Sequence, residues 1–97
     1  MKIPKFRLIS EPADAQARNL APFKWASGDL GKRHQLGGEP TFLQQPEWPL
    51  CRVCREAMSF YGQLDSINDE YVLADCGLVY VFVCFDDNEV QAVLQSG

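Results

Sequence analysis

The stretch LVYVFVCF, residues 78–85, is an unbroken apolar run rich in valine, tyrosine and phenylalanine. β-Branched and aromatic side chains favour extended backbone, and a strand without polar positions is typical of one that is covered on both faces. We therefore expect residues 78–85 to form the central strand of a sheet, buried on both sides.

The segment that follows alternates between apolar and polar residues. Val90, Ala92 and Leu94 alternate with Gln91 and Gln95. Alternation with a period of two is the pattern of a half-buried strand. These residues predict an edge strand near the C-terminal end of the chain.

The segment before the run, residues 57–65, alternates in the same way and predicts a third strand. The apolar positions that would share one face are Met58, Phe60 and Leu64. The opposite, polar face would carry Ser59, Tyr61, Gln63 and Asp65.

The rest of the chain is less regular. Residues 5–10 and 71–74 could each form a short strand, and the alanine-rich residues 13–21 predict a short helix that Pro22 would end. Residues 22–49 contain glycines and prolines that mark turns and extended segments, so we expect a packed or functional loop there.

Together these elements predict a β-rich α+β fold: a small antiparallel sheet with a cysteine knuckle and at most one short helix. The 97 residues fit a single domain. Residues 1–35 would supply the N-terminal strand and helix, and residues 36–97 the knuckle and the sheet core. A chain this short is marginally stable on its core alone, and a bound metal is one way to add stability.

The charge is unevenly distributed along the chain. Residues 1–35 carry about +4 and residues 36–97 about −8, within a net charge of −4. An acidic surface argues against nucleic acid as the partner, because binding to phosphates needs basic side chains. It favours a basic protein partner, although acidic loops also serve simply to keep a small protein soluble.

No targeting segment stands out in the sequence. The basic first residues are not followed by an apolar stretch long enough for a signal peptide, and no window is long enough to span a membrane. We therefore expect a cytoplasmic protein without a membrane partner. In that compartment, cysteines are thiols or metal ligands more often than disulfides.

Four residues form a candidate metal site. Cys51 and Cys54 make a C-x-x-C turn, whose two thiolates can reach one tetrahedral ion. Cys84 and Asp87 have the same spacing at the end of the apolar run, with a carboxylate at the fourth position. Asn88 follows, and asparagine tolerates the left-handed backbone of such a turn. The sequence predicts one zinc ion per chain.

Other interpretations of the cysteines stay open. Cys76 competes with Asp87 for the fourth position, but a straight strand would hold it about 26 Å from Cys84, so we favour Asp87 or a water. The C-x-x-C precedes a strand, whereas redox motifs open a helix, and a nucleophilic cysteine would need a base such as the one histidine, His34. The cysteines could also be unmetallated.

Several motifs, in the same order, resemble the YwqG-like family of bacterial domains of unknown function. They lie in residues 35–44, 48–54, 58–66 and 77–84. The programmed cell death protein two family, which contains ribosomal-protein chaperones, has a related order of motifs. The resemblance implies a β-rich fold, non-enzymatic binding and a zinc knuckle. The chain departs from the pattern with Phe42 for tryptophan, Arg55 for glycine and Asp87 for cysteine, and it is shorter than most YwqG-like proteins.

Aromatic and polar side chains near these motifs are candidates for partner contact. Phe42 and Trp48, with Trp25, could cover an open sheet face, or form a groove for a partner beside Gly37 and Gly38. From the polar face of their strand, Gln63 and Asp65 could also contact a partner. These four residues, Phe42, Trp48, Gln63 and Asp65, are the predicted partner-binding set.

The function expected from these features is a small, non-enzymatic protein-binding module. A toxin-neutralising immunity protein and a chaperone of a basic client would both place an acidic surface against a basic partner. A cysteine-dependent redox protein or enzyme is the competing class, and it requires a reactive thiol with a base in a cleft. A structural subunit without separable activity is a third possibility.

Overall fold

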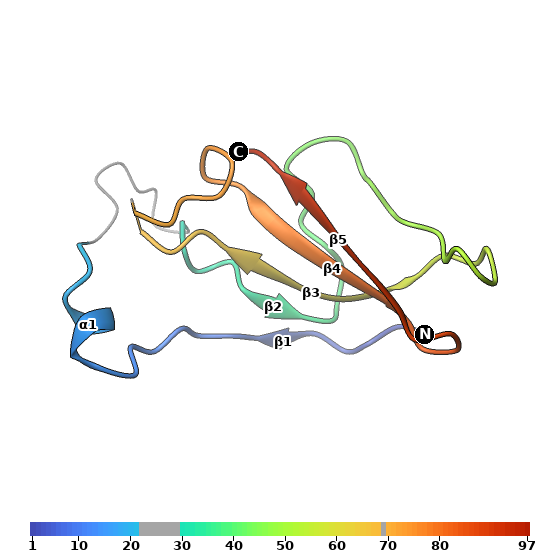
Figure 1. The fold of residues 1–97 in the computed structure, drawn as a ribbon, viewed down its shortest axis with the longest axis horizontal. Coiled ribbons are helices and arrows are strands. Elements are labelled where there is room, and N and C mark those ends of the chain that lie inside the picture. The colour runs from blue at the N-terminus through green and yellow to red at the C-terminus, as the bar shows by residue number, and fades with distance from the viewer. Residues whose placement is uncertain (22–29, 69) are drawn as a thin grey trace.

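The computed structural model describes residues 1–21, 30–68 and 70–97. Within them, five strands form one antiparallel sheet in which the spatial order follows the chain, β1-β2-β3-β4-β5 (Figure 1). The elements are β1 Phe6–Arg7, α1 Ala15–Arg18, β2 Gln35–Leu36, β3 Ser59–Asp65, β4 Leu78–Cys84 and β5 Glu89–Gln95. This is the predicted β-rich α+β fold. No helix in the described part of the chain is long and apolar enough to cross a membrane.

The apolar run forms β4, which lies between β3 and β5 and pairs with both along its whole length. Every second side chain of β4 is buried, and these four side chains are Leu78, Tyr80, Phe82 and Cys84. The prediction of burial on both faces is wrong, because the valines between them are only partly covered. The apolar residues of β4 therefore supply a core on one face and an open surface on the other.

A β-bulge in β3 changes which of its residues face the core. Phe60 pairs with Phe82 and Gly62 with Val81, so Tyr61 is an extra residue without a partner. A Cβ at Gly62 would lie 2.7 Å from the Gln35 carbonyl oxygen, so glycine is needed where β2 approaches.

The bulge overturns the strict alternation predicted for residues 57–65. Leu64 points to the exposed side of the sheet, and Gln63 and Asp65 point to the covered side with Phe60. The reason is that one inserted residue shifts the later side chains to the opposite face.

Three buried glutamines fasten the loop between β2 and β3 onto the covered face. Gln63 Oε1 accepts from the Thr41 N–H at 2.9 Å, and Gln95 Oε1 accepts from the N–H groups of Leu43 and Gln44 at 2.9 and 3.0 Å. Gln35 Nε2 donates to two carbonyl oxygens in the same loop. The part of the irregular segment that follows β2, residues 37–49, is thus a packed loop, and it forms the second layer over the sheet.

The glycine pair joins this loop to the N-terminal segment. Gly37 and Gly38 have φ angles of 59° and 67°, as a left-handed turn requires. A Cβ at Gly37 would lie 2.2 Å from the Pro4 carbonyl oxygen. The glycine pair therefore allows a close backbone approach, which brings residues 3–7 alongside β2.

The short elements differ from their predicted lengths. Only two residues of 5–10 pair as a strand, and only four of 13–21 are helical, with Asp14 as the N-cap. The helix end expected at Pro22 lies outside the described residues. Residues 71–74 are not a strand, because a run of left-handed residues begins at Ala74 and continues through Cys76.

Replacing Gln95 by methionine tests the role of the glutamines. Gln95→Met keeps the size of the side chain but leaves two loop N–H groups and the Gln45 carbonyl without this partner. We expect the free energy of unfolding to fall by about 1–3 kcal/mol. Urea denaturation measures this loss, and the exposed Gln91→Met is the control, with an expected change under about 0.5 kcal/mol. Equal effects of the two substitutions would contradict the role given to Gln95.

Candidate metal centre

Two turns that are far apart in the sequence meet at one end of the sheet. They bring together Cys51, Cys54, Cys84 and Asp87, whose ligand atoms all lie within 4.8 Å of one another. One turn is the knuckle before β3, and the other is the hairpin between β4 and β5. The four residues predicted from the sequence are thus close enough to hold a metal ion.

The knuckle is shaped by its own backbone. The N–H of Val53 donates to Cys51 Sγ at 3.4 Å, and the N–H of Arg55 donates to the Cys51 carbonyl at 2.9 Å. An isolated bridge between Leu50 and Ala57 closes the turn. Arg55 stands where the pattern of the YwqG-like family has glycine. Its φ of 66° is a left-handed conformation that glycine adopts readily.

The hairpin supplies the other two ligands. Cys84 is the last residue of β4, and the Asn88 N–H donates to its carbonyl at 2.9 Å. Asn88 has a φ of 57°, as expected for this turn. The turn directs the Asp87 carboxylate back to the thiols, with Oδ2 lying 3.4 Å from Cys51 Sγ and 3.6 Å from Cys84 Sγ.

Three of the distances between ligand atoms match those around a tetrahedral ion. Metal–sulfur bonds of about 2.3 Å at tetrahedral angles place two sulfurs about 3.8 Å apart, and a sulfur and an oxygen about 3.6 Å apart. Cys54 Sγ and Cys84 Sγ are separated by 3.8 Å. Three thiols and one carboxylate, all within 4.8 Å of one another, are therefore close enough to ligate a single ion.

The surroundings of the two knuckle thiols shift their pKa values in opposite directions. N–H groups, first that of Cys54 and then that of Val53, lower the pKa of Cys51 against the opposing effect of desolvation. The N–H of Glu56 would lower the pKa of Cys54, but desolvation and the neighbouring thiols and carboxyl raise it to about 12. Cys51 therefore loses its proton more readily, and a metal must displace the proton of Cys54. Metal binding to such a site releases protons.

Cys76 and His34 belong to the opposite end of the sheet. Cys76 precedes the start of β4, whereas Cys84 ends it, and seven strand residues span about 20 Å. His34 Nδ1 accepts the N–H of Asp65, which pairs with Leu78 at that far end. The choice of Asp87 over Cys76 agrees with the observed cluster.

The predicted aromatic pair packs onto the core. The Phe42 ring lies 5.0 Å from that of Tyr80, and the Trp48 ring lies 5.3 Å from that of Phe82. Trp48 Nε1 also donates to the Met58 carbonyl. Both rings therefore cover the sheet, although part of Trp48 stays exposed. Trp25 lies outside the described residues.

The prediction that Gln63 and Asp65 lie on a polar surface is wrong. Both are buried on the covered face, and groups within the chain satisfy their hydrogen bonds. Asp65 forms a two-pronged ion pair with Arg33, at 2.8 Å to Nε and 2.7 Å to Nη2. Arg33 was not among the residues predicted from the sequence. A glycine within a predicted strand, Gly62, was the signal for the bulge that turns Asp65 inward.

The Asp65 carboxylate should make the stability of the protein depend on pH. Burial would raise the pKa of Asp65, but the hydrogen bonds from the Arg33 side chain and backbone lower it below its usual value of about 3.9. A lowered folded-state pKa stabilises the protein above the unfolded pKa, and this stability disappears as the pH falls through the folded-state pKa. We expect the wild type to be more stable than Asp65→Asn at pH 7.

Urea denaturation at pH 7, 5 and 3 measures this difference in stability. The four-donor cluster is the same in the wild type and in Asp65→Asn, so its own pH dependence cancels in the comparison. The stability advantage of the wild type should be unchanged down to pH 5 and shrink towards pH 3. A constant difference over the whole range would contradict a lowered pKa at Asp65.

The structure thus defines a small antiparallel sheet with a centre of three thiols and one carboxylate. No protein-family model matches this chain, and no solved structure matches it. The chain is similar to the uncharacterized protein YpfL of Salmonella typhimurium, with 38% identity over 53 residues. The match covers 52% of this chain but only 12% of that protein.

Proposed function

We propose that this chain is a non-catalytic protein-binding module that one zinc ion stabilises. The observation that carries the proposal is the set of four donors, from two turns, around one tetrahedral position. A small domain gains folding stability when an ion joins two distant parts of its chain. Here the ion would join the knuckle to the β4–β5 hairpin.

Zinc suits this donor set better than the other common ions. Thiolates are soft ligands that select zinc, copper(I) and iron–sulfur clusters, whereas magnesium and calcium prefer oxygen donors. One carboxylate with three thiolates is compatible with zinc in a tetrahedral site. The resemblance to knuckle-containing families supports the same ion, and a reducing cytoplasm would keep the thiols available.

A structural role is favoured over a catalytic one. Catalytic zinc sites keep one coordination position open for water or substrate, while structural sites fill all four with protein ligands. Here the chain itself supplies four donors. The histidine that could serve as a base for a thiol, His34, lies at the other end of the sheet.

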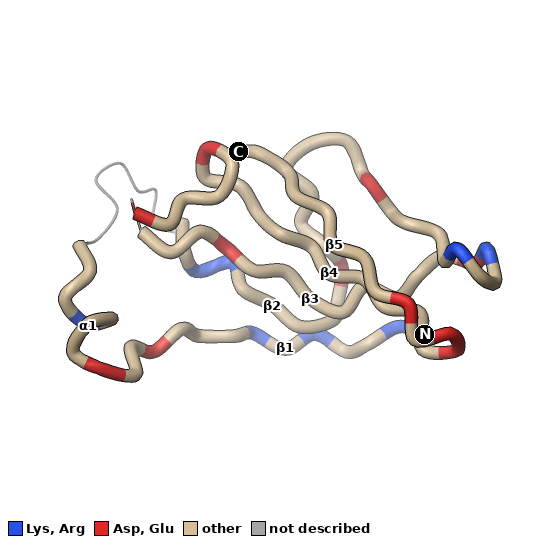
Figure 2. Tube along the Cα trace, viewed as in Figure 1, with Lys and Arg blue, Asp and Glu red and all other residues tan. Residues whose placement is uncertain are grey.

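We propose a basic protein as the partner. Residues 36–97 carry about −8, and exposed acidic side chains lie on several loops rather than in one patch (Figure 2). A field of this kind steers a positively charged protein towards the domain and raises its association rate. A toxin neutralised by an immunity protein and a ribosomal client of a chaperone are both basic partners of this kind.

Affinity purification from the native cell tests the binding function. The zinc-loaded protein is expected to retain basic proteins that 0.5 M salt releases, because exposed charges are screened at that ionic strength. A retained toxin encoded by a neighbouring gene would support immunity, and ribosomal proteins alone would support the chaperone role. Retention of no protein, or of acidic proteins that salt does not release, would contradict the proposal.

A cysteine-dependent redox role is the second candidate. Cys54 is exposed, and its sulfur lies 3.8 Å from that of Cys84, so this pair is the one positioned to react. Timed alkylation separates the two roles. Slow alkylation that a chelator accelerates would support structural zinc, whereas rapid alkylation of one thiol without chelator would support redox chemistry.

A further inference from the structure

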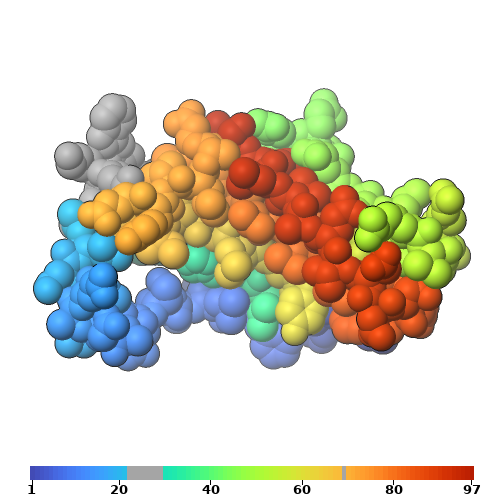
Figure 3. All heavy atoms as spheres, in the orientation of Figure 1, coloured from blue at the N-terminus to red at the C-terminus, as the bar shows by residue number. Residues whose placement is uncertain are grey.

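One face of the sheet is mostly apolar, and among the described residues no segment lies across β4 and β5 on that face (Figure 3). The side chains that point to it are aliphatic on β4 and β5, and on β3 they are Leu64 and the buried Ser59, which pairs with Val83. Their register forms continuous rows: Leu64, Val79 and Leu94 are neighbours, as are Val83 and Val90. We call this surface the open face: Leu64, Val79, Val81, Val83, Val90, Ala92 and Leu94.

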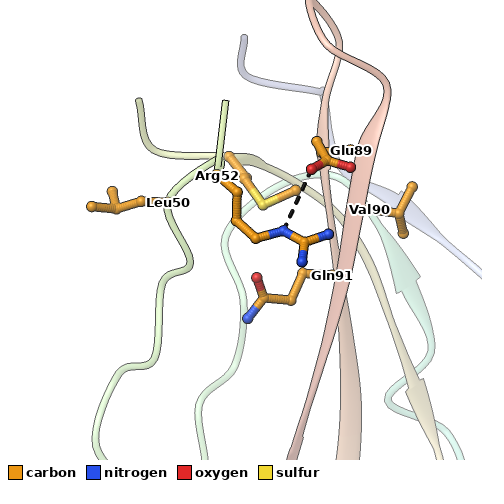
Figure 4. A pocket seen from close by; sticks show the side chains of 6 residues that line it. Leu50, Arg52, Glu89, Val90 and Gln91 are labelled. Carbon is orange, nitrogen blue, oxygen red and sulfur yellow. Dashed lines mark ion pairs between the residues drawn. The ribbon is translucent and has the colours of Figure 1, made fainter. Parts of the chain in front are cut away.

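The side chains at the rim of the open face are largely accessible. Leu64 is 49% exposed, Val90 63% and Leu94 53%. In Figure 3, β4 and β5 lie at the surface facing the viewer, and no drawn segment crosses them. Figure 4 shows Val90 directed away from the knuckle, with Gln91 directed towards it. The knuckle and the loop therefore cover the other face only.

The distribution of charge is the reverse of that expected for a sheet with one solvated face. Such a sheet usually carries polar side chains on the water side and apolar ones on the covered side. Here the charged residues of the five strands, Arg7, Asp65 and Glu89, all share the face of the buried core residues. The open face has none. Its composition is that of an interior surface.

The size of the open face suits a protein interface. Three strands of seven residues, about 23 Å long and about 4.8 Å apart, give a footprint of about 330 Å². The largest apolar patch on a typical monomeric protein covers about 300–600 Å² and is often a functional surface. A stable interface buries about 800 Å² per partner, with an apolar centre and a polar rim. The open face would supply that centre.

We propose that the open face binds the same face of a second copy of this chain. An aliphatic surface without charge is complementary to a second copy of itself, and two such sheets pack about 10 Å apart in sandwiches. Val81, in the middle of β4, would lie near the two-fold axis. A basic partner fits this face poorly, because its charges would lose water without gaining an opposite charge. The proposed binding of a basic protein would therefore use other surfaces.

The net charge makes the dimer distinguishable from a complex with a basic protein. Each copy carries −4, so the two copies repel one another at long range. Added salt screens this repulsion. The dimer should tighten between 0.05 and about 0.5 M salt, whereas binding of a basic protein should weaken.

Sedimentation velocity on the zinc-loaded chain tests the proposal. A monomer of 10.9 kDa is expected to form a species of about 22 kDa. Leu94→Lys should raise the dimer dissociation constant by about 30-fold or more, because it would bury an unpaired charge in the apolar interface. Gln91→Lys is the matched control, because it adds the same charge to the same strand on the opposite face. Its dissociation constant should stay within about 3-fold of wild type.

Zinc content and circular dichroism establish that each variant is folded. Leu64→Lys, on a different strand of the open face, repeats the test if Leu94→Lys fails to fold. A wild-type chain that stays monomeric at about 100 μM in 0.5 M salt would overturn the proposal. So would equal weakening by Gln91→Lys and Leu94→Lys.

Discussion

Replacing Cys84 by serine is expected to remove the metal and to lower the free energy of unfolding by about 3 kcal/mol or more, since metal binding contributes folding energy directly in small zinc domains. Cys84 is buried and holds the hairpin side of the centre. Without its thiolate, the knuckle and the hairpin lose their common ion. Urea denaturation with and without chelator measures the loss, and released zinc is quantified in the same samples.

Cys76→Ser is the matched control for this experiment. Cys76 is a free, partly buried cysteine outside the cluster. We expect it to keep one zinc and to change stability by less than about 1 kcal/mol. Chelator should destabilise the wild type and Cys76→Ser, but not Cys84→Ser. If chelator left the wild type unchanged, the ion would have no structural role.

Replacing Arg33 by methionine is expected to cost about 3–5 kcal/mol, the usual effect of breaking a buried ion pair. The Asp65 side chain is fully buried, and that of Arg33 is 22% exposed. Arg33 Nη2 also donates to the Cys76 carbonyl at 3.0 Å, which ties the 74–77 turn to β3. The variant leaves a buried carboxylate with backbone donors only.

Arg52→Met is the control for the ion-pair experiment. Arg52 pairs with Glu89 at 3.4 Å, beside the knuckle, but its side chain is 83% exposed (Figure 4). An exposed pair of this kind contributes at most about 1 kcal/mol. Urea denaturation of both variants at pH 7 gives the comparison. Similar losses would show that the burial of Asp65 adds little to the strength of its ion pair.

These two clusters lie at opposite ends of the same sheet. The cysteine–aspartate cluster brings the knuckle to the end of β4, and the Arg33–Asp65 pair joins the loop before β2 to the turn before β4. The core between them consists of few large side chains, mainly from β3 and β4. We therefore expect both ends to depend on specific polar contacts or a bound metal as well as on apolar burial.

The sequence predicted the centre because its determinants are local. Two C-x-x-[CD] turns each fix two donors within a few residues, and the strands between them make the turns meet. The three long strands were predicted for a similar reason: β-branched residues and alternation are local signals. Asn88 in a left-handed conformation was predicted on the same ground.

The faces of the strands could not be predicted in the same way. The bulge at Tyr61 depends on how β2 and β4 approach Gly62, which is a tertiary contact. Once it is missed, Gln63 and Asp65 are assigned to the wrong face. The run 78–85 was similarly ambiguous, because an apolar strand face can meet either a covering layer or another molecule.

X-ray absorption at the zinc edge, on protein purified without added metal, would show whether the four donors hold an ion. We expect one zinc per chain with three sulfur neighbours at about 2.3 Å and one oxygen at about 2.0–2.2 Å. Less than about a tenth of a zinc per folded chain would contradict it, because structural zinc is retained tightly. A coordination shell of nitrogen and oxygen without sulfur would contradict it as well.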